Sequence, residues 1–100
     1  SRSSGDAIAI ARRMAAMDGR MLGAYWCSHC INQKETMGRE AMAIVPYVEC
    51  DAEGSNSQRD VCDAAGVRGY PSWQLGGQLF PGEKSLEGLR ELLDDIEKAR

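Results

Sequence analysis

Basic residues, histidine and long apolar runs are all scarce in this chain of 100 residues. Twelve Lys and Arg against fifteen Asp and Glu leave a net charge of −3, and the basic residues form no cluster. This composition gives no electrostatic footprint for nucleic acid and no polybasic segment for anionic lipid. The longest apolar run spans only a few residues, too short for a transmembrane helix. We therefore expect neither nucleic-acid binding nor direct membrane insertion by this chain.

The sequence also lacks internal repeats and low-complexity segments. One hundred residues are typical of one domain. We expect residues 1–5 to be a linker or an expression remnant and residues 6–100 to form a single domain. The chain begins with Ser, and its start does not resemble a signal peptide, so we expect a processed domain whose targeting segment lies elsewhere.

Cysteine is the residue type that indicates chemistry. Cys27 and Cys30 form a Cys-x-x-Cys pair behind two aromatic residues, whereas Cys50 and Cys62 have eleven residues between them. Four cysteines allow three pairings. A second pair that can be oxidised favours an oxidising compartment.

The Cys-x-x-Cys pair is predicted to lie where a buried strand ends and a helix begins. An apolar run at 21–25 precedes it, and a helix-compatible run from about 28 to 42 follows. A cysteine at a helix start faces unpaired N–H groups and the positive end of the helix dipole, which favour thiolate over thiol. A second cysteine one turn later can close a disulfide with little backbone movement. The pattern is typical of a thioredoxin-like redox motif.

The helix over 28–42 has an imperfect apolar face. Ile31, Gly38 and Met42 share that face, but Glu35 falls among them, and Gly38 is expected to weaken or kink the helix.

The rest of the chain predicts alternating helices and strands. We expect a helix over 6–18 with Asp6 as its N-cap and Gly19 at its end, a strand over 45–50, a helix over 57–65 ending at Gly66, strands over 72–75 and 78–80 joined by a Gly76-Gly77 turn, and a last helix capped by Ser85. The order is helix, strand, helix, strand, helix, hairpin, helix. It predicts an α/β thioredoxin-like fold, a βαβ unit plus a β-hairpin and a C-terminal helix, with an extra N-terminal helix.

Several segments resemble those of one family. Residues 26–30 resemble the Trp-Cys-x-x-Cys active site of thioredoxin-like proteins, and residues 66–72 resemble their cis-proline segment, with Ser72 where Thr is usual. More narrowly, residues 21–93 resemble the thioredoxin-like domain fused to vitamin K epoxide reductase homologues in cyanobacteria, algae and plants. The matching segments are Gly23-Ala24-Tyr25-Trp26-Cys27-Ser28-His29-Cys30, Gln33-Lys34-Glu35 with Gly38, Tyr47-Val48-Glu49-Cys50, Cys62, Tyr70-Pro71-Ser72-Trp73 and Gly82 to Leu86.

The resemblance implies a protein thiol–disulfide oxidoreductase that oxidises cysteines of substrate proteins through a mixed disulfide at Cys27. It implies a partner, a vitamin K epoxide reductase-like membrane domain fused to this one, which takes the electrons and passes them to quinone. This chain would be the soluble half. No cofactor is expected within it, since the redox-active disulfide carries the electrons. The implied location is the thylakoid lumen of the chloroplast, with the bacterial periplasm as the alternative.

The roles of the residues around the pair follow from the same reasoning. Cys27 is the candidate nucleophile and Cys30 the resolving thiol. His29, when protonated, would stabilise a Cys27 thiolate, and Ser28 adds a hydroxyl donor. Met21 occupies the position, six residues before the first cysteine, of the buried Asp of thioredoxins. We therefore expect a potential above that of thioredoxin, between roughly −270 and −120 mV.

Two further pairs are assigned. X–Pro bonds have only a small trans preference, but base rates alone favour an ordinary turn proline at Pro71. The family resemblance implies instead that the Tyr70-Pro71 bond is cis and presents the Tyr70 backbone to an extended substrate. Cys50 and Cys62 are expected to pair with each other. Closing that loop would contribute roughly 3 kcal/mol. A structural role is favoured, and an electron relay from Cys27/Cys30 is the alternative.

Other side chains have weaker assignments. Lys34 or Glu35 would accept a proton from Cys30, although a solvated helix face is the simpler interpretation. Trp26 is assigned with Tyr70 and Ser28 to substrate binding. For Tyr25, Trp26 and Trp73, core filling is preferred over a binding rim.

Three alternative functions remain. A disulfide reductase or isomerase would share the chemistry and differ in potential. A zinc-binding structural module is disfavoured, because no second close cysteine pair is present. An inactive thioredoxin-like binding domain is disfavoured by the intact Cys27 and Cys30.

Overall fold

A mixed β-sheet forms the centre of the computed structural model, which describes residues 1–99. Within them the strand order is β2-β1-β3-β4. Strand β1 (Arg20–Gly23) pairs in parallel with β2 (Tyr47–Glu49) and antiparallel with β3 (Ser72–Leu75). Strand β4 (Gln78–Pro81) pairs antiparallel with β3 and forms one edge of the sheet.

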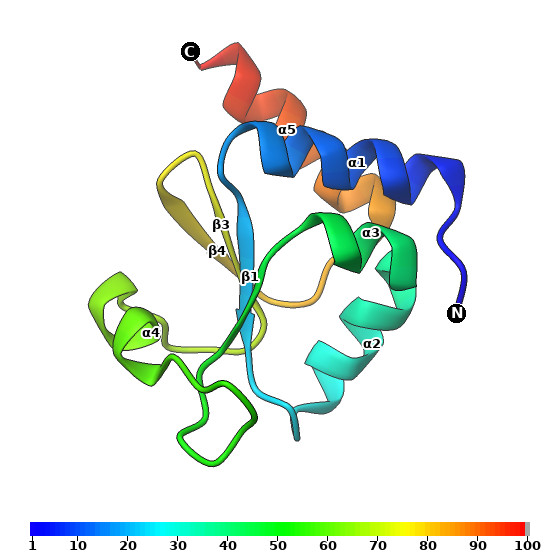
Figure 1. The fold of residues 1–100 in the computed structure, drawn as a ribbon. Coiled ribbons are helices and arrows are strands. Elements are labelled where there is room, and N and C mark those ends of the chain that lie inside the picture. The colour runs from blue at the N-terminus through cyan, green and yellow to red at the C-terminus, as the bar shows by residue number, and fades with distance from the viewer. Residues whose placement is uncertain (100) are drawn as a thin grey trace.

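Helices cover both sides of this sheet (Figure 1). They are α1 (Gly5–Ala16), α2 (Ser28–Met37), α3 (Arg39–Ile44), α4 (Arg59–Ala65) and α5 (Leu86–Lys98). Helices α1 and α5 run side by side across one end, α2 and α3 lie on the same side of β1, and α4 lies on the opposite side. The parallel β1-α2-α3-β2 unit, the β3–β4 hairpin and the closing α5 confirm the predicted thioredoxin-like fold, with α1 as the extra helix.

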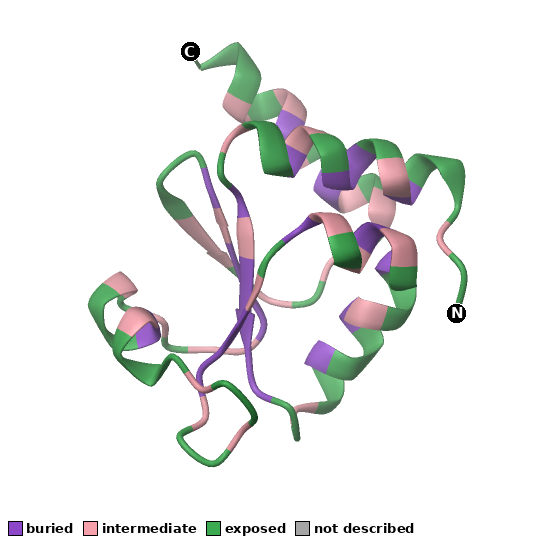
Figure 2. Ribbon diagram, viewed as in Figure 1, coloured by how far each residue is buried: buried purple, intermediate pink, exposed green. Residues whose placement is uncertain are grey.

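The two sides of the sheet bury separate apolar clusters, and β1 supplies both. Met21 packs with Trp73 and with the buried faces of α1, α2, α3 and α5. Leu22, the next residue, packs with Val48 and the two cysteines Cys50 and Cys62 on the α4 side. Successive side chains of a strand point to opposite faces, so a strand covered on both faces is apolar throughout. Figure 2 shows β1 as almost continuously buried.

Several sequence-based boundaries are confirmed. Gly66 ends α4 in the left-handed conformation, with φ of 80° and ψ of 27°. Gly76 and Gly77 both take positive φ in the turn between β3 and β4. The Ser85 side chain accepts a hydrogen bond from the Gly88 N–H and caps α5.

The start and end of α1 were predicted wrongly. Ser4, not Asp6, is the N-cap, and its hydroxyl accepts a hydrogen bond from the Ala7 N–H at 3.1 Å. The chain leaves the helix at Met17 and turns at Asp18, which has a φ of 54°, so Gly19 is not the terminating residue. Gly19 instead makes room, since a Cβ there would lie 2.8 Å from Leu75 Cδ2.

The expected helix over 28–42 is two helices separated at Gly38, which has a φ of 84° and a ψ of 166°. The face that α2 buries also differs from the prediction: Cys30, Gln33 and Met37 are buried, whereas Ile31 is 51% exposed. Strands β1 and β2 are both shorter than predicted. Strand β1 ends at Gly23, and β2 covers only Tyr47–Glu49. No helix within residues 1–99 is long and apolar enough to cross a membrane.

Candidate active site

Cys27 lies at the junction predicted for it, between β1 and α2. It is the N-cap residue of α2 and is partly exposed, and its thiol is free. The Cys27 Sγ lies 3.7 Å from the carbonyl oxygen of Tyr70 and donates a weak hydrogen bond to it. A sulfur in this position is open to a partner thiol and near the unpaired N–H groups of the first turn of α2.

Cys30 lies one helical turn later and is only 1% exposed, with a free thiol. The pKa of Cys30 is raised to about 12, chiefly by burial and also by the neighbouring Cys27, whereas a backbone hydrogen bond from Ala24 and the charge of Lys34 oppose the rise. The two thiols therefore differ in access. Only Cys27 is reachable by a large partner, and Cys30 is suited to attack from inside.

Tyr70 and Pro71 face the pair from the loop before β3, and the bond between them is cis, as predicted. The Trp26 ring packs edge-on against the Tyr70 ring, with ring centroids 6.0 Å apart. The Trp26 indole N–H also donates to Asp51 Oδ2 at 2.6 Å, and this hydrogen bond holds the pKa of Asp51 below its usual range.

The core-filling interpretation is correct for one aromatic residue and wrong for two. Trp73 is fully buried, whereas Tyr25 and Trp26 are 52% and 56% exposed. With Ile31, they are the exposed large hydrophobic residues within residues 1–99. They lie at the end of β1 and on the first turn of α2, so they form an apolar surface beside Cys27.

The two residues between the cysteines both point to solvent. Ser28 and His29 are exposed. His29 Nδ1 lies 2.9 Å from Oε1 of Glu83, which belongs to the loop between β4 and α5. The His29 imidazole, which was expected to stabilise a Cys27 thiolate, therefore also contacts the Glu83 carboxylate.

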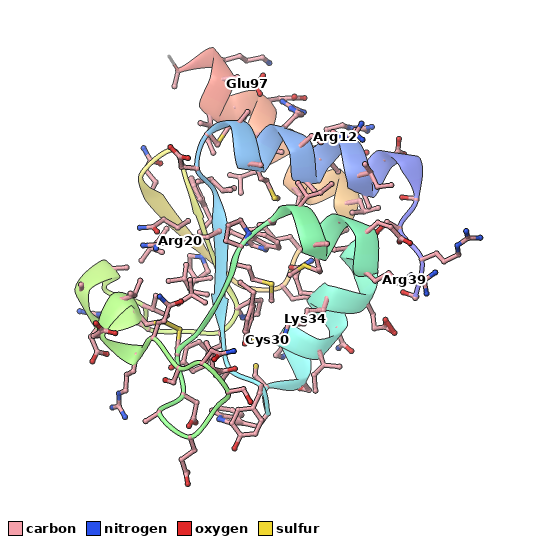
Figure 3. All side chains as sticks on the ribbon, in the orientation of Figure 1. Arg12, Arg20, Cys30, Lys34, Arg39 and Glu97 are labelled. Atoms are coloured by element: carbon pink, nitrogen blue, oxygen red, sulfur yellow. A yellow bond between two sulfur atoms is a disulfide. The ribbon has the colours of Figure 1, made fainter. Side chains whose placement is uncertain are left out.

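Beneath the pair lies a buried acid that the sequence did not reveal. Glu49, the last residue of β2, is 5% exposed and accepts the Tyr47 hydroxyl hydrogen at 3.0 Å. The Lys34 ammonium sits 3.7 Å from the centre of the Tyr47 ring. Figure 3 shows Lys34 and Cys30 on α2 facing the middle of the molecule. Glu35, by contrast, is exposed and binds Ser1, which agrees with the solvated-face interpretation.

A second unpredicted residue, Gln33, fixes the frame of the site. Its buried amide accepts hydrogen bonds from Trp73 Nε1 at 3.1 Å and from the Lys84 N–H at 2.8 Å, and donates one to the Lys84 carbonyl at 2.9 Å. These bonds join α2 to β3 and to the loop that carries Glu83. A glutamine between Asn32 and Lys34 gives no sequence signal of burial.

Cys50 and Cys62 form the predicted disulfide, and both are nearly fully buried. The alternative of a zinc site built from all four cysteines is therefore disfavoured, because the sulfurs of Cys50 and Cys62 are bonded to each other. Within residues 1–99, no group of three or more His, Cys, Asp or Glu side chains is arranged to hold a metal ion.

Comparison with known proteins finds a strong likeness to a plant thiol–disulfide oxidoreductase. The chain is 39% identical over 95 residues to the thiol-disulfide oxidoreductase LTO1 of Arabidopsis thaliana. The aligned region covers 92% of this chain but only 25% of that relative, so the chain spans about a quarter of its length. No family model matches the chain.

Proposed function

We propose that this chain is a protein thiol–disulfide oxidoreductase domain that oxidises cysteines of substrate proteins through a mixed disulfide at Cys27. We further propose that its electrons pass to a quinone-reducing membrane domain similar to vitamin K epoxide reductase, on the lumenal side of a thylakoid membrane. The name and the 39% identity of the Arabidopsis relative support the chemistry. The fused membrane domain and the location rest on the family resemblance of the sequence.

The observation that carries the proposal is the contrast between the two thiols at the start of α2. Cys27 is partly exposed beside the cis Tyr70-Pro71 bond, whereas Cys30 is buried one turn behind it. In a disulfide exchange protein the outer sulfur must meet the partner and the inner sulfur must meet only the outer one. The Tyr70 backbone beside Cys27 and the exposed Tyr25 and Trp26 side chains lie where an extended substrate would pass.

The proposed reaction moves two electrons. A substrate thiolate attacks Cys27 Sγ of the Cys27–Cys30 disulfide, and Cys30 leaves with the electron pair of the broken S–S bond. A second substrate thiolate then attacks the substrate sulfur of the mixed disulfide, and Cys27 leaves as a thiolate. The substrate gains a disulfide, and Cys27 and Cys30 gain the two electrons and end as thiols.

A glutathione redox titration tests this function. We expect a two-electron transition at a potential above that of thioredoxin, between roughly −270 and −120 mV. The Cys27→Ala variant is expected to lose the transition, and the Glu53→Gln variant, which alters an exposed carboxylate, is expected to keep it. Absence of a transition in the unaltered chain would overturn the proposed chemistry.

The same titration separates the oxidase from its alternative. A disulfide reductase needs a potential at or below about −270 mV, because its dithiol must donate electrons to substrate disulfides. A value in that range would assign this domain to reduction or isomerisation instead.

A further inference from the structure

The space between Cys30 and Tyr47 exists because residue 23 is glycine. A Cβ on Gly23 would lie 2.7 Å from Cys30 Sγ and 3.5 Å from the Tyr47 hydroxyl. Both atoms therefore face the same small gap at the end of β1. The parallel register places Gly23 opposite Glu49, so the acid that follows Tyr47 on β2 lies at the same level.

The Glu49 carboxylate is held in place by three hydrogen-bond donors. Oε1 accepts the Tyr47 hydroxyl hydrogen, and Oε2 accepts the N–H groups of Tyr25 at 3.3 Å and Asp51 at 3.0 Å. Gly54 covers it closely, since a Cβ there would lie 2.4 Å from Glu49 Cγ. An acid that is buried and receives only hydrogen-bond donors is built to be an acceptor.

Two of these bonds give the acid a structural role, because the carboxylate satisfies the backbone N–H groups of Tyr25 and Asp51. The third bond serves neither loop: it links the carboxylate to the Tyr47 hydroxyl, which faces the gap beside Cys30. The Lys34 ammonium lies over the Tyr47 ring, and Lys34, Glu49 and Glu53 line the same surface hollow of about 410 Å³. The hollow connects the Tyr47–Glu49 pair to solvent.

We propose that Glu49 and Tyr47 form the proton path of Cys30, with Tyr47 transferring the proton and Glu49 accepting it. The proposal rests on the proposed function, since it concerns the step in which Cys30 reacts. Tyr47 faces the reacting sulfur, and Glu49 acts through Tyr47. Position 21, where thioredoxins carry an acid, holds the buried Met21, so the acid reaches Cys30 from the neighbouring strand instead.

The path balances in both directions. When reduced Cys30 resolves a mixed disulfide, its thiol proton passes to the Tyr47 oxygen as the Tyr47 proton passes to Glu49. The Cys30 sulfur bonds to Cys27, the S–S bond to the partner breaks, and the partner leaves as a thiolate. When the Cys27–Cys30 disulfide is attacked from outside, Cys30 leaves as a thiolate. A proton from solvent then enters through the hollow and reaches Cys30 by way of Glu49 and Tyr47.

The path removes a real barrier. Burial raises the pKa of Cys30 to about 12, so its thiolate is scarce near neutral pH without a local acceptor. Burial, and next the hydrogen bond to Glu49, raises the pKa of Tyr47 well above its ordinary value, so Tyr47 does not itself hold the charge. The charged and titratable groups around Tyr47 and Glu49 are Cys27 and Cys30 at the start of α2, Lys34 further along α2, and Tyr25 and Glu53 from the flanking loops.

The test is a single-turnover reaction of the reduced chain with oxidised glutathione, quenched with acid and read by mass spectrometry. The adduct at Cys27 forms first and disappears when Cys30 attacks. For Glu49→Gln we expect adduct formation at the unaltered rate and adduct loss about a hundredfold slower at pH 7, the scale of general-base catalysis. Tyr47→Phe, which keeps the ring under Lys34, is expected to slow the same step alone. Glu53→Gln, which alters the exposed acid of the same hollow, is the matched control.

The pH profile separates proton transfer from a merely structural effect. Without the acceptor, loss of the adduct must follow the Cys30 thiolate population and rise about tenfold per pH unit between pH 6 and 9. The unaltered chain is expected to show a shallower profile. The relay is overturned if Glu49→Gln and Tyr47→Phe both clear the adduct at the unaltered rate with the unaltered profile. If Glu49→Gln does not fold, Tyr47→Phe decides. An unaltered chain that forms no adduct would overturn the proposed function and the relay with it.

Discussion

His29 and Glu83 lie against each other next to Cys27. Their nearest atoms are 2.9 Å apart, and the two side chains are 67% and 31% exposed. Positive charge near Cys27 favours the thiolate, so it stabilises the reduced state and makes the disulfide more oxidising. Glu83 adds negative charge at the same place. The net charge next to Cys27 is therefore more negative with Glu83 than with a neutral residue at position 83, in either protonation state of His29.

Replacing Glu83 by Gln should make the domain a stronger oxidant. The pair is exposed, and exposed pairs contribute about 0.2–1 kcal/mol. Since about 30 mV corresponds to 1.4 kcal/mol for two electrons, we expect a rise on the order of 5–20 mV in a glutathione titration at low salt. His29→Ala should shift the potential the other way, and salt should shrink both shifts.

Glu87→Gln is the control for this prediction. Glu87 is an acid of α5 whose carboxylate pairs with Arg90, so its loss should leave the potential unchanged. A potential that falls in Glu83→Gln would show that Glu83 does not oppose His29.

The placement of Cys27 and Cys30 at the start of α2 and the cis Tyr70–Pro71 bond were predictable from the sequence, because short motifs encode them. Glu49 was not, although it stands inside an apolar strand where a charged residue is rarely buried without a partner. An acid within an apolar segment could therefore have been noticed in the sequence. Its neighbours could not have been predicted, because the parallel register that puts Glu49 opposite Gly23 joins residues far apart in sequence. The sequence offered only Lys34 or Glu35 of the helix as proton acceptors for Cys30, with a solvated helix face as the simpler interpretation.

Gly38 divides what the sequence suggested was one helix. Its φ of 84° and ψ of 166° are accessible essentially only to glycine. A Cβ at this position would also lie 2.6 Å from Ser3 Cα. The Ser3 hydroxyl accepts the Ala41 N–H at 2.9 Å and so caps α3 from the start of the chain. The break lets α2 point Cys27 and Cys30 at the sheet edge while α3 packs on α1.

Gly38→Ala should lower the free energy of unfolding for two reasons: the backbone conformation at residue 38 disfavours any side chain, and the added Cβ would collide with Ser3. We expect an unfolding free energy lower by roughly 1–3 kcal/mol for the conformation, with a further loss from the contact with Ser3. Urea denaturation measures it. Gly66→Ala is the matched control, because Gly66 has a φ of 80° but nothing within 4 Å of its Cβ position. Equal losses in the two variants would mean that Ser3 does not constrain the break.

The elements with local signals were predictable, and those that depend on distant partners were not. Ser85, Gly66 and the Gly76-Gly77 turn act on their immediate neighbours, and each does what its sequence predicts. The cap of α3 comes from Ser3, far away in the chain, and the buried face of α2 is set by Trp73 and Lys84 through Gln33. No helical periodicity in residues 28–42 contains that information.

The molecule keeps its two cysteine pairs in different surroundings. Cys27 is partly exposed on the side of α2, whereas Cys50 and Cys62 are 2% and 3% exposed in the cluster between the sheet and α4. Thiol exchange needs access of the attacking sulfur along the S–S bond, and burial denies it. The disulfide instead ties the end of β2 to α4, the helix that covers its side of the sheet. The arrangement favours a structural role for this pair over an electron relay.

The double variant Cys50→Ala/Cys62→Ala tests that role. Loss of a bridge that closes a short loop should lower the unfolding free energy by about 3 kcal/mol, because the unfolded chain regains conformational freedom. The rate at which Cys27 captures glutathione should not change, because α2, which begins at Cys27, packs on the other side of the sheet. The Cys27→Ser variant is the counterpart, expected to lose capture and to keep nearly all of its stability. A double variant that unfolds at the unaltered urea concentration but no longer passes electrons to an acceptor thiol pair would make Cys50 and Cys62 a relay. Helix α4 would then have to move away during each turnover to expose both sulfurs, and hydrogen exchange in α4 would reveal that opening.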